Sequence, residues 1–275
     1  NIQEFSTYKS MIYQTKIKNN WIYMLFFQPD VYLYKLIFNT IFVGAVAFLL
    51  TYICMDYNIH INVPATAHQL VGVAIGLLLV YRTQTAYERW STASKNFNEI
   101  YNTLIFITMK LHTFLVFSDK EFQQQKQKEF SDIVKDFTSN FKAYLKSTDA
   151  EMSTNFELCY LEGIKRMFNF VSELEDESSL GITRSDTNLI HKAMQELINS
   201  CGSCVKIKNT PIPISYALHI KVSIFLYILS LPFGLFSALG LWSAVMVMFT
   251  YYIIAGIEII SKEIENPFHG DPNDL

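Results

Sequence analysis

The sequence predicts an all-α membrane protein, with four transmembrane helices and a helical cytosolic domain. Hydrophobic residues make up 51% of the 275 residues and charged residues only 17%, against about 25% charged residues in typical soluble proteins. The apolar residues gather into long uncharged stretches, whereas the middle of the chain has the spacing of amphipathic helices. The same composition excludes a disordered chain, which requires low hydrophobicity and high net charge.

The charge balance and the motifs exclude several function classes. The net charge is −3, and the chain has no basic run that would neutralise the phosphates of a nucleic acid. It has no Gly-rich dinucleotide-binding or phosphate-binding motif, and its six histidines lack metal-ligand spacing on a helix. We therefore expect neither an enzyme nor a nucleic-acid-binding protein, and no required cofactor.

Two transmembrane helices are predicted in the first third of the chain. Residues 36–55 contain no charged side chain and are bracketed by Lys35 and Asp56. Their length matches the requirement of about 20 residues for a membrane helix. A second uncharged stretch occupies residues 57–81. We expect 57–117 to form one very long helix, or two nearly continuous ones, that starts in the membrane and continues into the cytosol.

The third and fourth helices are predicted from the longest uncharged stretch, residues 222–257. At a rise of about 1.5 Å per residue, this stretch is too long for one crossing of a roughly 30 Å hydrocarbon core. The chain must therefore turn, and the segment 231–234 (LPFG) and Gly240 are the candidate breaking points. We expect a helical hairpin with arms near residues 213–231 and 236–260.

Lysine and arginine residues lie on one side of the four predicted helices. They precede the first helix and follow the second, whereas the short connections within each pair contain neither residue. The positive-inside rule then places both termini and the middle region in the cytosol of a multi-pass protein of the cell membrane. No signal peptide is expected, and the initial Asn is typical of a trimmed sequence.

The chain is expected to divide into five segments. These are a cytosolic N-terminal segment, the first two membrane helices, a helical cytosolic domain, the last two membrane helices and an acidic tail, at residues 1–30, 31–90, 91–208, 209–260 and 261–275. In the cytosolic domain, Phe130, Ile133, Val134 and Phe137 follow the i, i+3, i+4, i+7 spacing of an amphipathic helix. After a polar loop, Ser185 is expected to cap another helix.

Three further motifs leave alternatives open. Cys201 and Cys204 have the C-x-x-C spacing of redox and metal sites, but in an all-helical region we expect a structural role. The segment 82–90 (RTQTAYERW) either anchors a helix at the membrane interface or locks neighbouring helices together through Glu88, Arg89 and Trp90. The acidic segment 263–275 offers oxygen ligands for Ca²⁺ without the spacing of an EF-hand, so it is either an ion site or solvated charge.

Three segments taken together resemble the bestrophin family of ion channels. They are residues 75–90 (IGLLLVYRTQTAYERW), 209–235 (NTPIPISYALHIKVSIFLYILSLPFGL) and 263–275 (EIENPFHGDPNDL). The resemblance covers about residues 30–275 and is closest to the bacterial branch. It implies a homopentamer in the bilayer around one central pore, which conducts small monovalent ions passively. Eukaryotic bestrophins are chloride channels, so an anion channel is the function that the resemblance implies.

The resemblance places the pore neck on Val73, Leu77 and Tyr81. These residues are four apart and share one helix face, and a ring of five such apolar side chains can gate by dewetting. The eukaryotic neck has two Phe residues, whose partly positive ring edges can face an anion, whereas Leu77 has no ring. A cation-selective channel is therefore one alternative. A non-conducting membrane interaction or sensor protein is the alternative from another class.

Two further sites are implied by the resemblance. A second constriction in the cytosolic vestibule falls on Ile182, or on Ser185 by an ungapped count. The Ca²⁺ clasp of the eukaryotic members maps onto Glu263, Asn266, Asp271 and Asp274. This tail has fewer carboxylates than the eukaryotic one, which weakens Ca²⁺ binding, so packing of the tail between subunits is the alternative.

Overall fold

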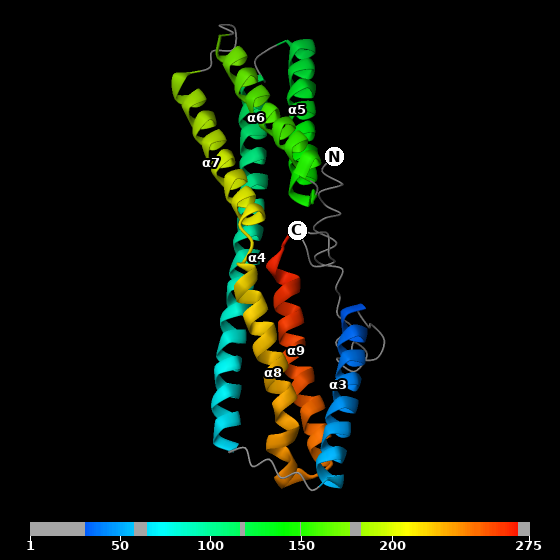
Figure 1. The fold of residues 1–275 in the computed structure, drawn as a ribbon. Helices are drawn as coiled ribbons and strands as arrows, with labels where there is room; N and C mark the ends of the chain where they lie inside the picture. The colour runs from blue at the N-terminus through cyan, green and yellow to red at the C-terminus, as the bar shows by residue number, and fades with distance from the viewer. Residues whose placement is uncertain (1–30, 58–64, 116–118, 149, 177–182, 269–275) are drawn as a thin grey trace, which may run out of the picture. The chain divides into compact units, whose positions relative to one another are not determined.

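The computed structural model describes residues 31–57, 65–115, 119–148, 150–176 and 183–268, and all regular structure in these ranges is α-helical. This described part contains seven helices (Figure 1). They are α3 (Val31–Asp56), α4 (Ala65–Leu115), α5 (Lys120–Lys146), α6 (Ala150–Asp176), α7 (Arg184–Asn209), α8 (Ile214–Leu239) and α9 (Trp242–Glu265). The predicted all-α class is confirmed.

The chain forms two compact units, each built from segments that are distant in sequence. The first unit comprises residues 1–76 and 221–259, and the second comprises 77–220 and 260–275. Helices α4, α8 and α9 contribute residues to both units. Helix α4 is continuous over 51 residues, which confirms the prediction of one very long helix after the first apolar stretch.

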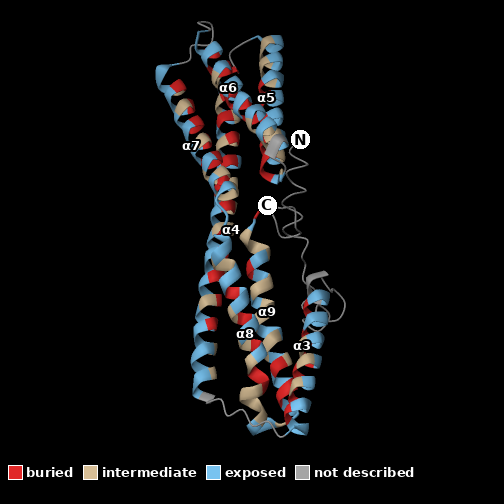
Figure 2. Ribbon diagram, viewed as in Figure 1, coloured by how far each residue is buried: buried red, intermediate tan, exposed pale blue. Residues whose placement is uncertain are grey.

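Four helices of the described residues are long and apolar enough to cross a membrane: α3, α4, α8 and α9. Most of their apolar surface is uncovered, and only 28% of the most apolar window of α3 is buried. Figure 2 shows this as long pale-blue and tan runs on α3. Apolar side chains on the outside of a helix are stable in hydrocarbon but not in water, as expected of a multi-pass membrane protein.

The turn between α8 and α9 differs from the predicted one. Helix α8 continues through Pro232 and ends at Leu239, so the predicted break at 231–234 is wrong. The chain turns instead at Gly240, whose φ of 54° lies in the left-handed region that glycine adopts at low cost. Proline removes only one helical hydrogen bond, and membrane helices tolerate it when neighbouring groups satisfy the freed carbonyl.

Helices α3 and α9 approach each other closely within the first unit. A side chain at Gly44 would overlap the Met248 side chain, which would have to move, so glycine favours this close approach of the two helices. Near the other end of α3, the hydroxyls of Thr51 and Ser243 are 3.1 Å apart and both residues are buried. Small residues and a hydroxyl pair are the usual means by which helices associate in lipid.

The second unit has a conventional hydrophobic core. Helices α5, α6 and α7 and the C-terminal part of α4 bury their apolar faces against one another, which Figure 2 shows as red faces on these helices. Phe130, Ile133 and Phe137 are at most 4% exposed, so the predicted amphipathic face of α5 is confirmed. Lys208 of α7 donates hydrogen bonds to the Tyr144 carbonyl and the Ser147 hydroxyl near the end of α5.

The N-terminal cap of α7 is Thr183 and not Ser185 as predicted. The Thr183 hydroxyl accepts a hydrogen bond from the Asp186 backbone N–H at 3.3 Å and donates one to the Asp186 carboxylate at 2.6 Å. The first bond is that of an N-cap, but the carboxylate of Asp186, at the third helical position, accepts from the Thr183 hydroxyl and not from its backbone N–H as in a capping box. Ser185 lies inside the first turn because Arg184 already begins the helix.

Candidate functional site

One row of apolar side chains on α4 is uncovered in the single chain. Val73, Leu77 and Tyr81 are 64%, 55% and 65% exposed. Between them, Ile75 and Leu79 are only 4% and 2% exposed, so α4 packs with one face and leaves this row free. The row contains the three residues predicted for the neck, which share a face because they are four apart.

The same row continues toward the C-terminus of α4 with polar side chains. At 3.6 residues per turn, Gln84, Glu88 and Lys95 lie within roughly 20° of Leu77 around the helix axis. All three are exposed, and Gln84 Nε2 donates to Glu88 Oε1 at 3.1 Å. Sequence reasoning did not assign Glu88 and Lys95 to this row, although counting helical turns onward from Leu77 would have found them.

A buried ion pair holds the packed face of α4. Arg82 is 2% exposed, and its Nη2 lies 3.5 Å from Oε2 of Glu265 on α9, which is 14% exposed. Beside this pair, the hydroxyls of Thr83 and Ser261 are 2.6 Å apart. A buried charge is stable only when it is paired and hydrogen-bonded, so this pair fixes the place of α4 against the end of α9 in the second unit.

Arg89 binds the ends of two other helices. Its guanidinium donates to the carbonyls of Glu265, Thr210 and Ile207 at 3.2, 2.6 and 2.8 Å. The last carbonyls of a helix have no partner within the helix and carry a partial negative charge. Arg89 therefore caps α7 and α9 at once. Of the two alternatives for the segment 82–90, the helix lock is correct, but Arg82 and Arg89 make it and Glu88 lies on the exposed row.

The remaining predicted site residues lie partly outside the described residues. Ile182, Asp271 and Asp274 are not among them. Glu263 is half-buried in the last turn of α9 and Asn266 is exposed just after it. Among the described residues, no three His, Cys, Asp or Glu side chains come close enough to hold a metal ion. The Ca²⁺ site and the second constriction stay predictions.

Cys201 and Cys204 lie side by side on the buried face of α7. Both are free thiols with at most 2% exposure. Burial raises the pKa of both thiols, that of Cys204 to about 12, and the charge of Glu99 adds to the rise at Cys204. A redox site needs an accessible thiol with a lowered pKa, so this environment suits the structural role.

Thiol labelling tests this reading of the cysteine pair. At pH 8 we expect a maleimide to label exposed Cys159 quickly, and to label Cys201 and Cys204 only after unfolding. The pH is then well below the raised pKa of about 12, so the buried thiols stay protonated and unreactive. Mass spectrometry counts the labels, and Cys159→Ser should remove the fast label. Fast labelling of Cys204 in the folded protein would show a reactive site instead.

Comparison with known proteins identifies the family. Residues 11–275 match the family described as Bacterial/Fungal Bestrophin protein. A voltage-dependent anion channel-forming protein of Nostoc sp. is 29% identical over 95% of this chain and 88% of its own length. A protein of the same description from Synechocystis sp. is 28% identical over 78% of this chain and 73% of its own length.

The fold has close structural neighbours as well. The crystal structure of a bacterial bestrophin homolog from Klebsiella pneumoniae superimposes with a TM-score of 0.74, at 18% identity, over 88% of this chain and 92% of that one. The likeness establishes a shared fold, and the family match over nearly the whole sequence confirms the predicted resemblance. This chain belongs to the bacterial and fungal bestrophins, a family of membrane ion channels and not of enzymes.

Proposed function

We propose that this chain is one subunit of a homopentameric channel of the cell membrane, which conducts monovalent anions passively. Each subunit crosses the bilayer four times and has both termini in the cytosol. Helix α4 lines the pore, with Val73, Leu77 and Tyr81 as the neck. The exposed apolar row on α4 is the observation that carries the proposal, because five copies of it around an axis form a dry constriction.

Ions cross the neck by shedding part of their hydration shell. Apolar rings offer no ligands in exchange, so a narrow neck dewets easily and resists ion flow. Glu88 and Lys95 lie on the polar continuation of the row, so in the proposed pore they line the wider cytosolic part, where their fields bias which ions enter. The relatives named as anion channel-forming proteins support anions as the conducted species.

Cation selectivity is the second candidate function. Glu88 lies on the exposed row of α4, and five copies would form a carboxylate ring of the kind that cation channels use. Leu77 also lacks the aromatic edge that can face an anion. Lys95 on the same row opposes this effect, so the balance between two rings of opposite charge decides the selectivity.

A bilayer recording under an asymmetric KCl gradient tests the proposal. A reversal potential near the chloride equilibrium value is the expected result, and one near the potassium value would establish the cation channel instead. Absence of current from both the parent protein and a Leu77→Ala variant would favour the non-conducting interaction or sensor protein. The same recording, with Ca²⁺ added and then chelated, tests Glu263, Asn266, Asp271 and Asp274 as a weak Ca²⁺ site.

Neutralising the charged side chains of the row distinguishes an anion-selective channel from a cation-selective one. We expect Glu88→Gln to raise the anion-to-cation permeability ratio severalfold, because five negative charges leave the pore entrance. Lys95→Gln should change the ratio in the opposite direction. Reversal potentials at low ionic strength measure both shifts, since screening weakens them in high salt. If the parent protein, Glu88→Gln and Lys95→Gln all have the same reversal potential, α4 does not line the ion pathway.

The cytosolic constriction is proposed at Ile182, just before the cap of α7. An apolar ring there forms a second narrow point on the same axis. Ile182→Ala should then raise conductance, and the resistance that it removes should add to the resistance removed by a neck variant, because resistances in series are additive. If Ser185→Ala raises conductance and Ile182→Ala does not, the constriction lies at Ser185 instead.

A further inference from the structure

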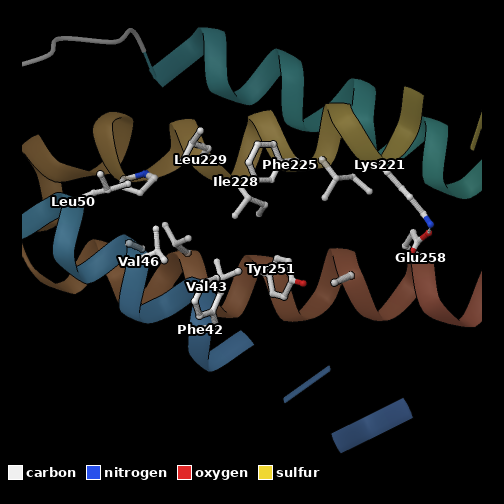
Figure 3. Close-up of a pocket in the computed structure, with 15 residues that line it drawn as sticks. Phe42, Val43, Val46, Leu50, Lys221, Phe225, Ile228, Leu229, Tyr251 and Glu258 are labelled. Atoms are coloured by element: carbon white, nitrogen blue, oxygen red, sulfur yellow. Dashed lines mark ion pairs between the residues drawn. The ribbon is translucent and has the colours of Figure 1, made fainter. Parts of the chain in front are cut away.

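A cavity of about 300 Å³ opens between three apolar helices of the first unit. Helices α3, α8 and α9 form its walls, and each is long and apolar enough to cross a membrane. Figure 3 shows that α3 contributes one group of side chains and that α8 and α9 contribute the others. Among the labelled residues are Phe42, Val46, Leu50, Phe225, Ile228 and Tyr251.

Most of the cavity lining is hydrocarbon and reaches the outer surface. Phe42 and Phe225 are 64% and 65% exposed, although aromatic side chains of this size are usually buried in a soluble protein. Residues 222–257 contain no charged side chain. Within a bilayer, such a groove is filled by lipid acyl chains, because an empty apolar space would forfeit its dispersion contacts.

One end of the cavity carries an ion pair. Lys221 Nζ lies 3.7 Å from Glu258 Oε1, and the two side chains are 49% and 14% exposed. Among the described residues that line the cavity, they are the only charged ones, and Figure 3 shows them at the end away from Leu50. An ammonium group has three donors, so half-exposed Lys221 can bind an anion while it keeps its carboxylate partner.

The dimensions of the cavity match one leaflet of a bilayer. Along α8, Lys221 and Pro232 both line it, and the helix rises roughly 16 Å between them at about 1.5 Å per residue. This is close to half of a roughly 30 Å hydrocarbon core. The ion pair lies toward the lysine-rich side of the membrane helices, where the positive-inside rule places the cytosolic headgroups.

We propose that this cavity binds an aminophospholipid, with one acyl chain between α3, α8 and α9 and its headgroup at the ion pair. Lys221 binds the phosphate and Glu258 binds the ammonium group. Sites for anionic lipids contain several basic residues, whereas this one offers one charge of each sign, which matches a zwitterionic headgroup such as phosphatidylethanolamine. The site does not depend on ion conduction.

Native mass spectrometry of the full chain tests this site. The protein is reconstituted with equal amounts of phosphatidylethanolamine and phosphatidylglycerol, and the retained lipids are counted. The double variant Lys221→Gln with Glu258→Gln removes both charges without leaving a carboxylate unpaired. We expect it to retain about tenfold less phosphatidylethanolamine, the typical effect of losing charge-assisted hydrogen bonds. Val46→Trp, which fills the cavity, should produce the same loss.

Lys35→Gln provides the matched control. Lys35 is an exposed lysine of α3 that does not line the cavity, so its loss should leave lipid retention unchanged. Equal retention by the parent, the double variant and Val46→Trp would overturn the proposal, as would a preference for phosphatidylglycerol. If the parent retains no lipid and Val46→Trp changes the oligomeric state, the groove is a contact between copies. None of these readouts uses current, so the channel proposal is judged separately.

Discussion

Replacing Arg82 with methionine is expected to lower the apparent melting temperature of the purified protein by about 10 °C. Loss of one partner from a buried ion pair costs about 3–5 kcal/mol, and each kcal/mol shifts the midpoint of a chain of this size by roughly 2–4 °C. The cost is large because the Glu265 carboxylate, 14% exposed, would lose the guanidinium that forms its ion pair. Thermal unfolding in detergent, followed by fluorescence, measures the shift.

Lys165→Met is the matched control for this variant. Lys165 Nζ lies 3.5 Å from a Glu162 carboxylate oxygen, the same separation as in the buried pair, but the two side chains are 67% and 57% exposed. Exposed pairs contribute only about 0.2–1 kcal/mol, so the shift should be small. Adding Glu265→Gln to Arg82→Met should restore part of the lost stability, because no unpaired carboxylate remains. Equal shifts for Arg82→Met and Lys165→Met would show that burial does not strengthen the Arg82 pair.

The membrane helices could be predicted from the sequence because their signal is local and strong. An uncharged stretch of about 20 residues has few stable alternatives to a membrane helix. The position of a turn is less certain, because proline and glycine both interrupt soluble helices. Pro232 lies inside α8, as membrane helices tolerate proline, whereas Gly240 provides the positive φ that the turn requires.

The candidate site was predictable only where it lies on one helix. Val73, Leu77 and Tyr81 share a face by their spacing alone, and the family resemblance supplied the reason to choose that face. The pairing of Arg82 with Glu265 joins residues from different segments of the chain. No periodicity in the sequence indicates such a contact. The sequence therefore identified the charged segment 82–90 but not the residues with which it pairs.

The packed face and the exposed face of α4 therefore have different roles. On the packed face, Arg82 and Arg89 bind groups at the ends of α7 and α9 and fix the helix in place. On the opposite face, the apolar row around Leu77 makes none of these contacts and stays exposed. Substitutions on the first face should change stability, whereas substitutions on the second should change conduction with little change in stability.

Truncating side chains of the apolar row is the strongest test of whether one face of α4 controls stability and the other controls conduction. We expect Leu77→Ala to raise single-channel conductance severalfold, and Tyr81→Ala to do the same. In a pentamer each substitution removes five side chains from the same level of the pore, which widens the neck and lowers the cost of wetting it. Single-channel recording in symmetric KCl measures the conductance. Because both side chains are more than half exposed in the single chain, their loss leaves no cavity in its core.

Val71→Ala is the control for position on the helix. Val71 is also an exposed residue of α4, at 48%, but it lies about 120° around the helix from Leu77 and outside the proposed neck. Its truncation should leave conductance unchanged, and all three variants should elute as the same oligomer. If Val71→Ala raises conductance as much as Leu77→Ala, general loosening of α4 is responsible. If neither variant changes it in a folded oligomer, α4 does not form the neck, and the ion pathway lies along another helix.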